Sequence, residues 1–210
     1  MSDRKIMVID RSTLFSDGYF QGFAPAEEID YESVIQENYF YDLRDKVETM
    51  PQYKQPIAYT VIVHKPTLEV FAYQRAARDK HYKEKRLQGK WSWGIGGHID
   101  KADVEKEDPI RASLERELGE EIYISSYEAP QILGYINDDL TEVGQVHFGL
   151  LYIIFTSERQ IRPRDGEMSW GGFMTIAQLQ DICENEDAAV ESWSEIALIP
   201  LRHYLGVDLE

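Results

Sequence analysis

The sequence predicts an α/β protein with a mixed β-sheet and an N-terminal extension. The stretch IAYTVIVH (57–64) is apolar on both alternating faces, which is typical of a central strand that is covered on both sides. A second long apolar stretch, VHFGLLYIIFT (146–156), is also predicted to be a strand. Between them, residues 109–122 have the spacing of an amphipathic helix. Strands interspersed with helices in this way favour an α/β or α+β architecture.

Length, charge and cysteine content exclude several classes of protein. A chain of 210 residues suits one domain, or one domain with an extension, and 43% hydrophobic residues supply a core. The net charge of −16 argues against nucleic-acid binding, which depends on Lys and Arg, but not against a small phosphorylated ligand whose charge a metal ion offsets. The single cysteine, Cys183, excludes an internal disulfide and a multi-cysteine zinc site. Neither a signal peptide nor an apolar run of membrane-spanning length is expected, so the prediction is a cytoplasmic protein with no membrane partner.

The N-terminal part reads as one strand, a loop and one helix. KIMVID (5–10) predicts a short strand, and the Gly and Pro residues of 16–28 predict a loop. A helix is expected from Asp30 to about Glu48, because apolar residues recur there at every fourth position. We predict that residues 1–54 form an extension packed on a core domain of residues 55–210.

The rest of the chain supplies further strands and three helices. After a turn, residues 69–75 are expected to form a hairpin with the strand at 57–64, and residues 76–90 a polar loop. Further strands are predicted at 91–99 and 131–137, the second joined by a hairpin loop (138–144) to 146–156. Two later helices are predicted. The first begins with a Thr175–Gln178 capping box and runs to about Glu184, and the second covers about 187–198.

The helix predicted at 109–122 carries three clustered carboxylates. Asp108 followed by Pro109 is a favourable helix start. At ~100° per residue, Glu117, Glu120 and Glu121 share an arc of ~100° beside the apolar ridge. Clustered carboxylate oxygens are the ligands that Mg²⁺ prefers. The alternative is a solvated acidic face, which is common in acidic proteins.

The helix and the glycines before it resemble the Nudix box, G-x5-E-x7-R-E-U-x-E-E-x-G-U, where U is aliphatic. The matching residues are Arg116, Glu117, Leu118, Glu120, Glu121 and Ile124. Asp108 stands where the family has Glu. Two departures are present: Gly97 lies eleven residues before Asp108 instead of six, which implies a five-residue insertion, and Tyr123 replaces the glycine that ends the helix. The resemblance covers about 55–185, and within the superfamily the chain looks similar to the predicted phosphoesterases of the MutT type.

The resemblance implies a fold and a reaction. The fold would be a Nudix-type α/β/α sandwich, and the reaction a metal-dependent hydrolysis of a diphosphate bond in a nucleoside diphosphate derivative or a related small molecule. Glu120 and Glu121 would bind Mg²⁺ or Mn²⁺, and Glu117 would be a further ligand or the base, oriented by Arg116. The carbonyl group of Gly97 would complete the metal's ligands. A later loop supplies a base or ligand in some members, and Glu167 is the candidate here; its alternative is an ordinary exposed glutamate.

Three residues are candidates for substrate binding. The segment 75–90 has a net charge of +5 that could steer a polyphosphate, and Arg75 at the end of a strand is the best single candidate. Trp93 could stack on a base, although packing in the core is the favoured alternative. His98, beside the glycines, could touch phosphate or make a structural hydrogen bond.

Two other functions remain open. An isomerase acting on isopentenyl diphosphate shares the fold but needs a cysteine near its active site, where Cys183 is not expected. A nucleotide-sensing Nudix domain without catalysis often lacks carboxylates of the box, whereas this chain retains Glu117, Glu120 and Glu121. A homodimer is expected by analogy alone. The identity of the substrate and of the general base stays open.

Overall fold

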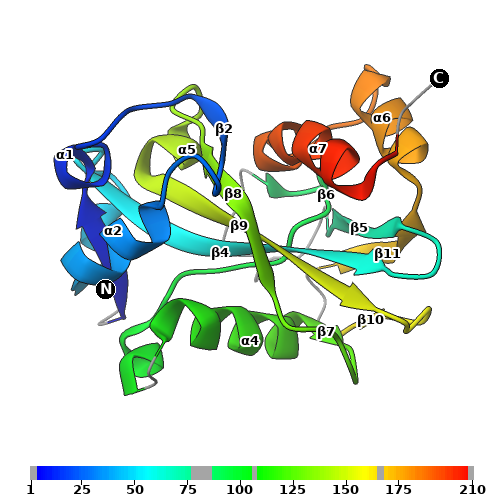
Figure 1. Ribbon diagram of the computed structural model, residues 1–210, viewed down its shortest axis with the longest axis horizontal. Helices are drawn as coiled ribbons and strands as arrows, with labels where there is room; N and C mark the ends of the chain where they lie inside the picture. Colours follow the sequence, from blue (N-terminus) through cyan, green and yellow to red (C-terminus); the bar gives the residue numbers. More distant parts are fainter. Residues whose placement is uncertain (1–3, 77–86, 106–107, 165–167, 208–210) are drawn as a thin grey trace. The chain divides into compact units, whose positions relative to one another are not determined.

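The computed structural model describes residues 4–76, 87–105, 108–164 and 168–207 (Figure 1). The chain forms two compact units that alternate along the sequence. The first unit comprises Met1–Tyr59, Gly96–Arg116 and Ile132–Tyr152, and the second comprises Thr60–Ile95, Glu117–Gln131 and Ile153–Glu210. The first unit joins residues from both sides of position 54, where we proposed a boundary. Within the described ranges, no helix is long and apolar enough to cross a membrane.

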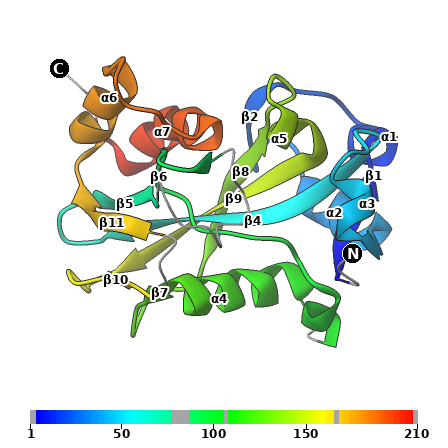
Figure 2. The same cartoon turned by 180° about the vertical axis from the view of Figure 1, so that it is seen from behind.

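The first unit opens with a buried strand, β1 (Lys5–Asp10), as predicted. It pairs antiparallel with β3 (Phe40–Leu43), and its last two residues pair with the beginning of β4 (Tyr53–His64). The short helices α1 (Arg11–Leu14), α2 (Tyr31–Asn38) and α3 (Arg44–Val47) lie close to these strands (Figure 2). Ile6 and Val8 of β1 and Val47 of α3 are fully buried together, and Phe40 of β3 packs against them, so these elements share one small core.

The helix predicted over 30–48 is wrong in its second half. Its start is confirmed, because Asp30 accepts a hydrogen bond from the backbone N–H of Ser33. The helix ends at Asn38, however, and Tyr39 is extended at φ −71° and ψ 158°. Phe40–Leu43 then pairs with β1 along its whole length. Pairing with a strand far away in the sequence therefore overrides the local four-residue spacing.

In the first unit, strands follow the order β4-β9-β8-β2. The strand β9 (His147–Thr156) and the strand β8 (Gln131–Asn137) were predicted. The strand β2 (Gly22–Pro25) was not, because it lies in the segment predicted as a loop; it pairs antiparallel with the end of β8. The one-turn helix α5 (Glu142–Val146) begins in the predicted hairpin loop, ends at Val146, and is capped by the side chain of Thr141.

An aromatic cluster fills the space beside these strands. Its ring centroids lie 5.1 to 6.3 Å apart, mostly edge to face. Its members are Phe15, Phe20, Tyr31, Tyr135 and Phe148. The N-terminal segment thus contributes three of the five rings, and it is part of the core of the first unit.

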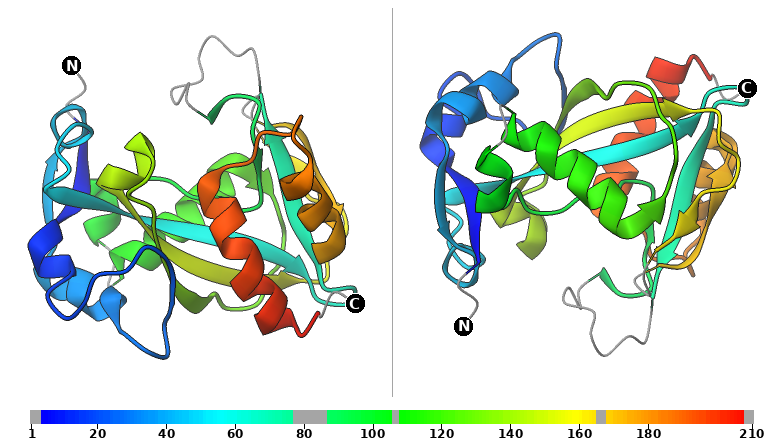
Figure 3. Two further views of the ribbon diagram at one scale, coloured as in Figure 1. Left: turned by 90° about the horizontal axis from the view of Figure 1, so that it is seen from above. Right: turned by 90° about the horizontal axis from the view of Figure 1, so that it is seen from below.

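In the second unit, strands follow the order β11-β5-β4-β9. The predicted strand β5 (Glu69–Arg75) pairs antiparallel with β4, with β11 (Met168–Met174) and with β6 (Trp91–Ser92). The helices α6 (Ile176–Glu184) and α7 (Ser192–Leu205) lie against each other (Figure 3). The fold class is α/β with a mixed sheet, as predicted.

Two more predicted elements differ in extent. The strand expected over 91–99 stops at Ser92 and continues only as single bridges at Ile95 and His98, because glycines interrupt it. The last helix begins at Ser192, since Val190 is still extended and forms a bridge with Trp91. The capping box that we predicted for α6 is confirmed, with Thr175 and Gln178 bonded to each other's backbone groups.

Candidate active site

The carboxylate helix is α4 (Pro109–Glu121), which begins where the sequence predicted and ends one residue earlier. Asp108 caps it, because its Oδ1 accepts a hydrogen bond of 3.0 Å from the backbone N–H of Arg111. The predicted apolar ridge faces the interior, with no member more than 1% exposed; its residues are Ile110, Leu114, Leu118 and Ile122. Burial of this ridge fixes which way the remaining faces of the helix point.

Two of the three clustered carboxylates lie beside the buried ridge. Glu117 and Glu121 are each 9% exposed, whereas Glu120 is exposed. All three belong to the second unit and lie on one turn of α4. Burying a carboxylate is costly unless it is paired, hydrogen-bonded or bound to a metal. Oxygen donors from one helical turn fit a hard dication such as Mg²⁺.

The end of α4 explains how Tyr123 replaces a glycine. The helix passes directly into the short strand β7 (Ile122–Tyr123), which pairs antiparallel with β10 (Arg162–Pro163). The backbone N–H of Arg164 donates to the carbonyl of Glu121 at 2.8 Å, and its guanidinium lies 4.3 Å from the ring centroid of Tyr123. A turn into an extended strand needs no left-handed residue, so the side chain of tyrosine is accommodated.

The insertion in the glycine segment forms a short 3-10 helix, η2 (Lys101–Glu105), that holds Arg116. The Nε and Nη2 atoms of Arg116 donate to the two oxygens of Asp103, each at 3.1 Å. Nη2 also donates to the carbonyl of His98 at 2.9 Å and to the hydroxyl of Ser113 at 3.2 Å. Sequence reasoning missed Asp103, whose only signal was its place in the inserted segment.

Gly97 lies half-buried in the segment that precedes this insertion. Its neighbour Gly96 leaves no room for a side chain, because a Cβ there would overlap the carbonyl oxygen of Ala58. Strand β1 holds the other end of the segment: the N–H of Met7 donates to the carbonyl of Ile99 at 2.8 Å. The N-terminal residues therefore help to position the glycines.

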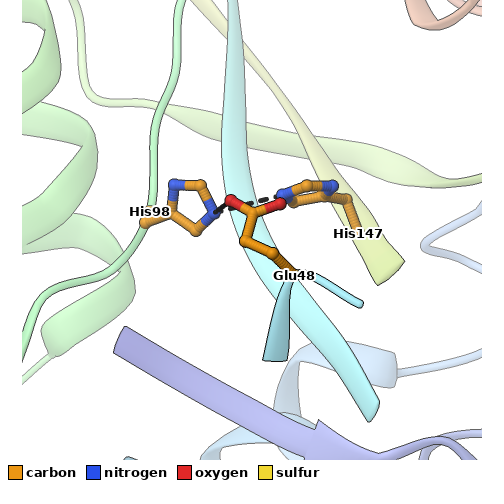
Figure 4. A group of neighbouring side chains, drawn as sticks. All are labelled: Glu48, His98 and His147. Carbon is orange, nitrogen blue, oxygen red and sulfur yellow. Dashed lines mark hydrogen bonds and ion pairs between the residues drawn. The ribbon is translucent and has the colours of Figure 1, made fainter. Parts of the chain in front are cut away.

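His98 points into the first unit and makes structural hydrogen bonds. It is 9% exposed, and its Nε2 lies 2.8 Å from Oε1 of Gln55 and 3.1 Å from Nε2 of His147. The carboxylate of Glu48 completes the group, 3.8 Å from the same nitrogen (Figure 4). Burial lowers the pKa of His98 well below its ordinary value, and His147 and the arginines nearby add to this effect. The sequence pattern gave no hint of Glu48 or Gln55.

Arg75 and Trp93 lie in the second unit. The Nε of Arg75 forms an ion pair with Glu191, whose other oxygen accepts a hydrogen bond of 2.9 Å from Ser92. The side chains of Arg75 and Glu191 are 12% and 7% exposed. Trp93 is only 1% exposed, as packing in the core requires. Glu167 and most of the basic segment, residues 77–86, lie outside the described residues.

Comparisons with known proteins give both a relative in sequence and neighbours in structure. No family model matches the chain. Protein YmaB of Bacillus subtilis (strain 168) is 34% identical over 161 residues, which cover 74% of this chain and 74% of YmaB. The crystal structure of Tm1382, a candidate Nudix hydrolase, is similar with a TM-score of 0.72 and 25% identity, over 95% of this chain and 99% of that one. The NUDIX domain of Shewanella oneidensis NrtR, solved with ADP ribose, shares the fold with a TM-score of 0.54 and 16% identity, over 72% of this chain and 88% of that one.

Proposed function

The chain belongs to the Nudix superfamily and to the same family as YmaB, and on that premise we propose that it is a divalent-metal-dependent pyrophosphohydrolase. Its substrate would be a nucleoside diphosphate derivative or a related small phosphorylated molecule. The observation that carries the proposal is the set of three carboxylates, Glu117, Glu120 and Glu121, on one turn of α4.

The donor atoms of this set favour a hard cation. We propose Mg²⁺ or Mn²⁺ with carboxylate ligands from Glu117, Glu120 and Glu121. The carbonyl oxygen of Gly97 stays a ligand that only the resemblance to the Nudix box implies. When bound, such an ion polarises a phosphoryl oxygen and makes a bound water more acidic. Two of the carboxylates are nearly buried, and a bound dication would compensate the cost of keeping them ionised there.

The other residues have roles in orientation and proton transfer. Glu117 would act as ligand or base, and Arg116, whose guanidinium is held by Asp103, would orient it. Glu167 remains a proposed base from a later loop. Arg75, His98 and Trp93 remain proposed substrate contacts, but the ion pair of Arg75 and the burial of the other two agree equally with structural roles.

A panel of substrates tests the proposal. Purified protein is incubated with nucleoside diphosphate derivatives, ADP-ribose among them because NrtR was solved with it, in the presence and absence of Mg²⁺. We expect hydrolysis of the diphosphate bond, detected as release of the two phosphorylated halves of the substrate, only when the metal is present. Tight binding of a nucleotide with no turnover across the panel would favour a sensing domain.

The proposed homodimer is checked separately, by size-exclusion chromatography with light scattering on the same preparation.

A matched pair of variants tests the assignment of the carboxylates. Glu120→Gln should lower kcat by at least about 10²-fold, the scale of losing one electrostatic stabiliser of a transition state. Glu115→Gln is the control, because Glu115 is exposed on the same helix and forms only a loose pair with Arg111, 3.8 Å away. Wild-type turnover by Glu120→Gln would show that this residue is not a ligand.

A further inference from the structure

The buried group at the start of β9 is a candidate for a second metal site, separate in its residues from the carboxylates of α4. The group consists of Glu48, His98 and His147, whose ligand atoms all lie within 4.8 Å of one another. They come from the end of α3, the glycine segment and the start of β9, and all three belong to the first unit. Two imidazoles and a carboxylate converge on one point (Figure 4).

The distances in this group suit a tetrahedral ion. The Nε2 atoms of His98 and His147 lie 3.1 Å apart, and Oε1 of Glu48 lies 3.8 Å from His98 Nε2. Around Zn²⁺, with metal–nitrogen bonds of ~2.0–2.1 Å, two tetrahedral ligands are about 3.3 Å apart. Oε1 of Gln55, 2.8 Å from the same nitrogen of His98, offers a fourth donor.

The outer contacts turn these donor atoms towards the common point. Nδ1 of His147 lies 2.6 Å from the carbonyl oxygen of Val143, so Nδ1 carries the proton and Nε2 presents its lone pair. A backbone carbonyl on the far nitrogen is the usual partner of a metal-binding histidine. Arg44 donates to Glu48 at 3.0 Å and holds its carboxylate. The amide nitrogen of Gln55 faces the carbonyl of Val47, which leaves its oxygen directed at the histidines.

The surrounding charges leave room for a dication. Three arginines lie near His98, and each is bonded to a carboxylate: Arg4 to Asp100, Arg44 to Glu48 and Arg116 to Asp103. Arg4 and Arg116 are therefore compensated by carboxylates outside the group, whereas Arg44 shares the carboxylate of Glu48 with the proposed ion. Imidazole ligands favour zinc and its first-row neighbours, whereas Mg²⁺ prefers oxygen ligands only.

We propose that Glu48, His98 and His147 bind a first-row transition-metal dication, zinc first among them. The side-chain oxygen of Gln55 is the fourth ligand. The site is structural: with both histidines 9% exposed or less, the ion ties the glycine segment to α3, β4 and β9. It shares no ligand with the ion proposed at α4, because none of its ligands is a carboxylate of that helix.

Cobalt is the first probe, because four-coordinate Co²⁺ absorbs visible light much more strongly than six-coordinate Co²⁺. The full chain, without a polyhistidine tag and stripped of metal, is titrated with Co²⁺ in excess Mg²⁺, which occupies oxygen-only sites. We expect an intense four-coordinate spectrum that saturates at about one ion per chain, and displacement of that ion by Zn²⁺. A weak six-coordinate spectrum would overturn the proposal.

Variants assign the ion to these residues. His98→Gln and His147→Gln should each weaken the binding of Co²⁺ at least about 10-fold, whereas His203→Gln, an exposed histidine of α7, should bind it like the wild type. Glu120→Gln should lose turnover yet keep the cobalt spectrum, which separates this site from the proposed active site. Equal binding by His98→Gln, His147→Gln and His203→Gln would refute the site.

A direct measurement covers the case in which the histidine variants do not fold. Anomalous diffraction from wild-type crystals grown with Zn²⁺ should show a peak about 2.1 Å from Nε2 of both His98 and His147. A peak elsewhere, or none at this position, would mean that the histidines form only a hydrogen-bonded pair.

Discussion

Asp103 holds Arg116 through two parallel hydrogen bonds of 3.1 Å, one to each carboxylate oxygen. Asp103 is 6% exposed, and its carboxylate also accepts a bond of 2.8 Å from the backbone N–H of Asp100. The five-residue insertion that departs from the Nudix box thus supplies a positioning residue for an arginine of the box. Such bidentate, charge-assisted pairs fix orientation as well as adding stability.

Asp103→Asn should therefore lower kcat and leave KM nearly unchanged. The amide cannot pair with both guanidinium nitrogens as a charged acceptor, so Arg116 loses its orientation, and we expect a decrease in kcat of about 10-fold. Asp103→Glu should restore part of the rate because it keeps the charge. Steady-state kinetics on the best substrate of the panel provides the measurement, with Asp181→Asn, an exposed residue of α6, as control. If Asp103→Asn has the kcat of the wild type, the function of Arg116 does not depend on its orientation by Asp103.

Arg75 and Glu191 allow a test of substrate binding against structure. If the guanidinium contacts phosphate, Arg75→Gln should raise KM about 10-fold, whereas Glu191→Gln, which keeps the guanidinium, should not raise it. Both changes break the same nearly buried pair, so both should lower the free energy of unfolding by about 3 kcal/mol. Urea unfolding and steady-state kinetics on the two variants separate the effects. If KM stays the same in both variants, Arg75 has only a structural role.

Asp139 links the N-terminal segment to the buried start of β4. It accepts hydrogen bonds from Arg11, from Tyr19 at 2.8 Å and from the fully buried Lys54 at 2.8 Å. Burial opposes ionisation of Asp139, but these donors outweigh it and hold its pKa well below the ordinary value. Removing the carboxylate leaves Lys54 with carbonyl acceptors alone, at Gly144 and His147.

Asp139→Asn should consequently lower stability in a pH-dependent way. Because the folded pKa is depressed, the contribution of the carboxylate is complete above the unfolded pKa of ~3.9 and is lost as the pH falls through the folded value. We expect a loss of about 3 kcal/mol at pH 7 that shrinks below about pH 4. Urea unfolding of wild type and variant across this range measures it, with Asp187→Asn, an exposed residue, as control. If the difference in the free energy of unfolding between wild type and variant does not change with pH, ionisation of Asp139 is not what stabilises the fold.

Two glycine-to-alanine changes should have opposite effects on the free energy of unfolding. At Gly144 a Cβ would overlap the carbonyl oxygen of Asp138 and lie 2.9 Å from Oγ1 of Thr141, so the backbone has to move. We expect Gly144→Ala to destabilise by about 1–3 kcal/mol. At Gly119, within α4, nothing lies within 4 Å of a Cβ, and alanine should stabilise by about 0.5–1 kcal/mol. Thermal unfolding checks both, and a loss of stability in Gly119→Ala would mean that this face of α4 is covered.

The elements that could be predicted are those whose signals are local. The helix α4 is marked by its aspartate cap, its proline and an apolar ridge, and each of these signals lies within its own residues. The capping box of α6 is equally local. By contrast, β3 and β2 exist because they pair with β1 and β8, and no spacing within Phe40–Leu43 or Gly22–Pro25 records those partners.

The residues of the candidate sites also differ in whether their signals are local in the sequence. The three glutamates of α4 could be proposed as one group because one helical turn brings them together, whatever the rest of the fold does. Asp103, Glu48 and Gln55 were missed because their partners, Arg116 and His98, lie in other segments. Only folding brings these polar groups within hydrogen-bond distance of each other.

The attachment of β1 to the glycine segment has an evolutionary consequence. The strand holds this segment through the bond from Met7 to Ile99 and the ion pair of Arg4 with Asp100, at 2.8 and 2.6 Å. A recombination event that swapped the first residues for those of another lineage would strip the glycines of their support and leave apolar side chains uncovered. We therefore expect changes in the first strand and in the glycine segment to be coupled, because each supports the other.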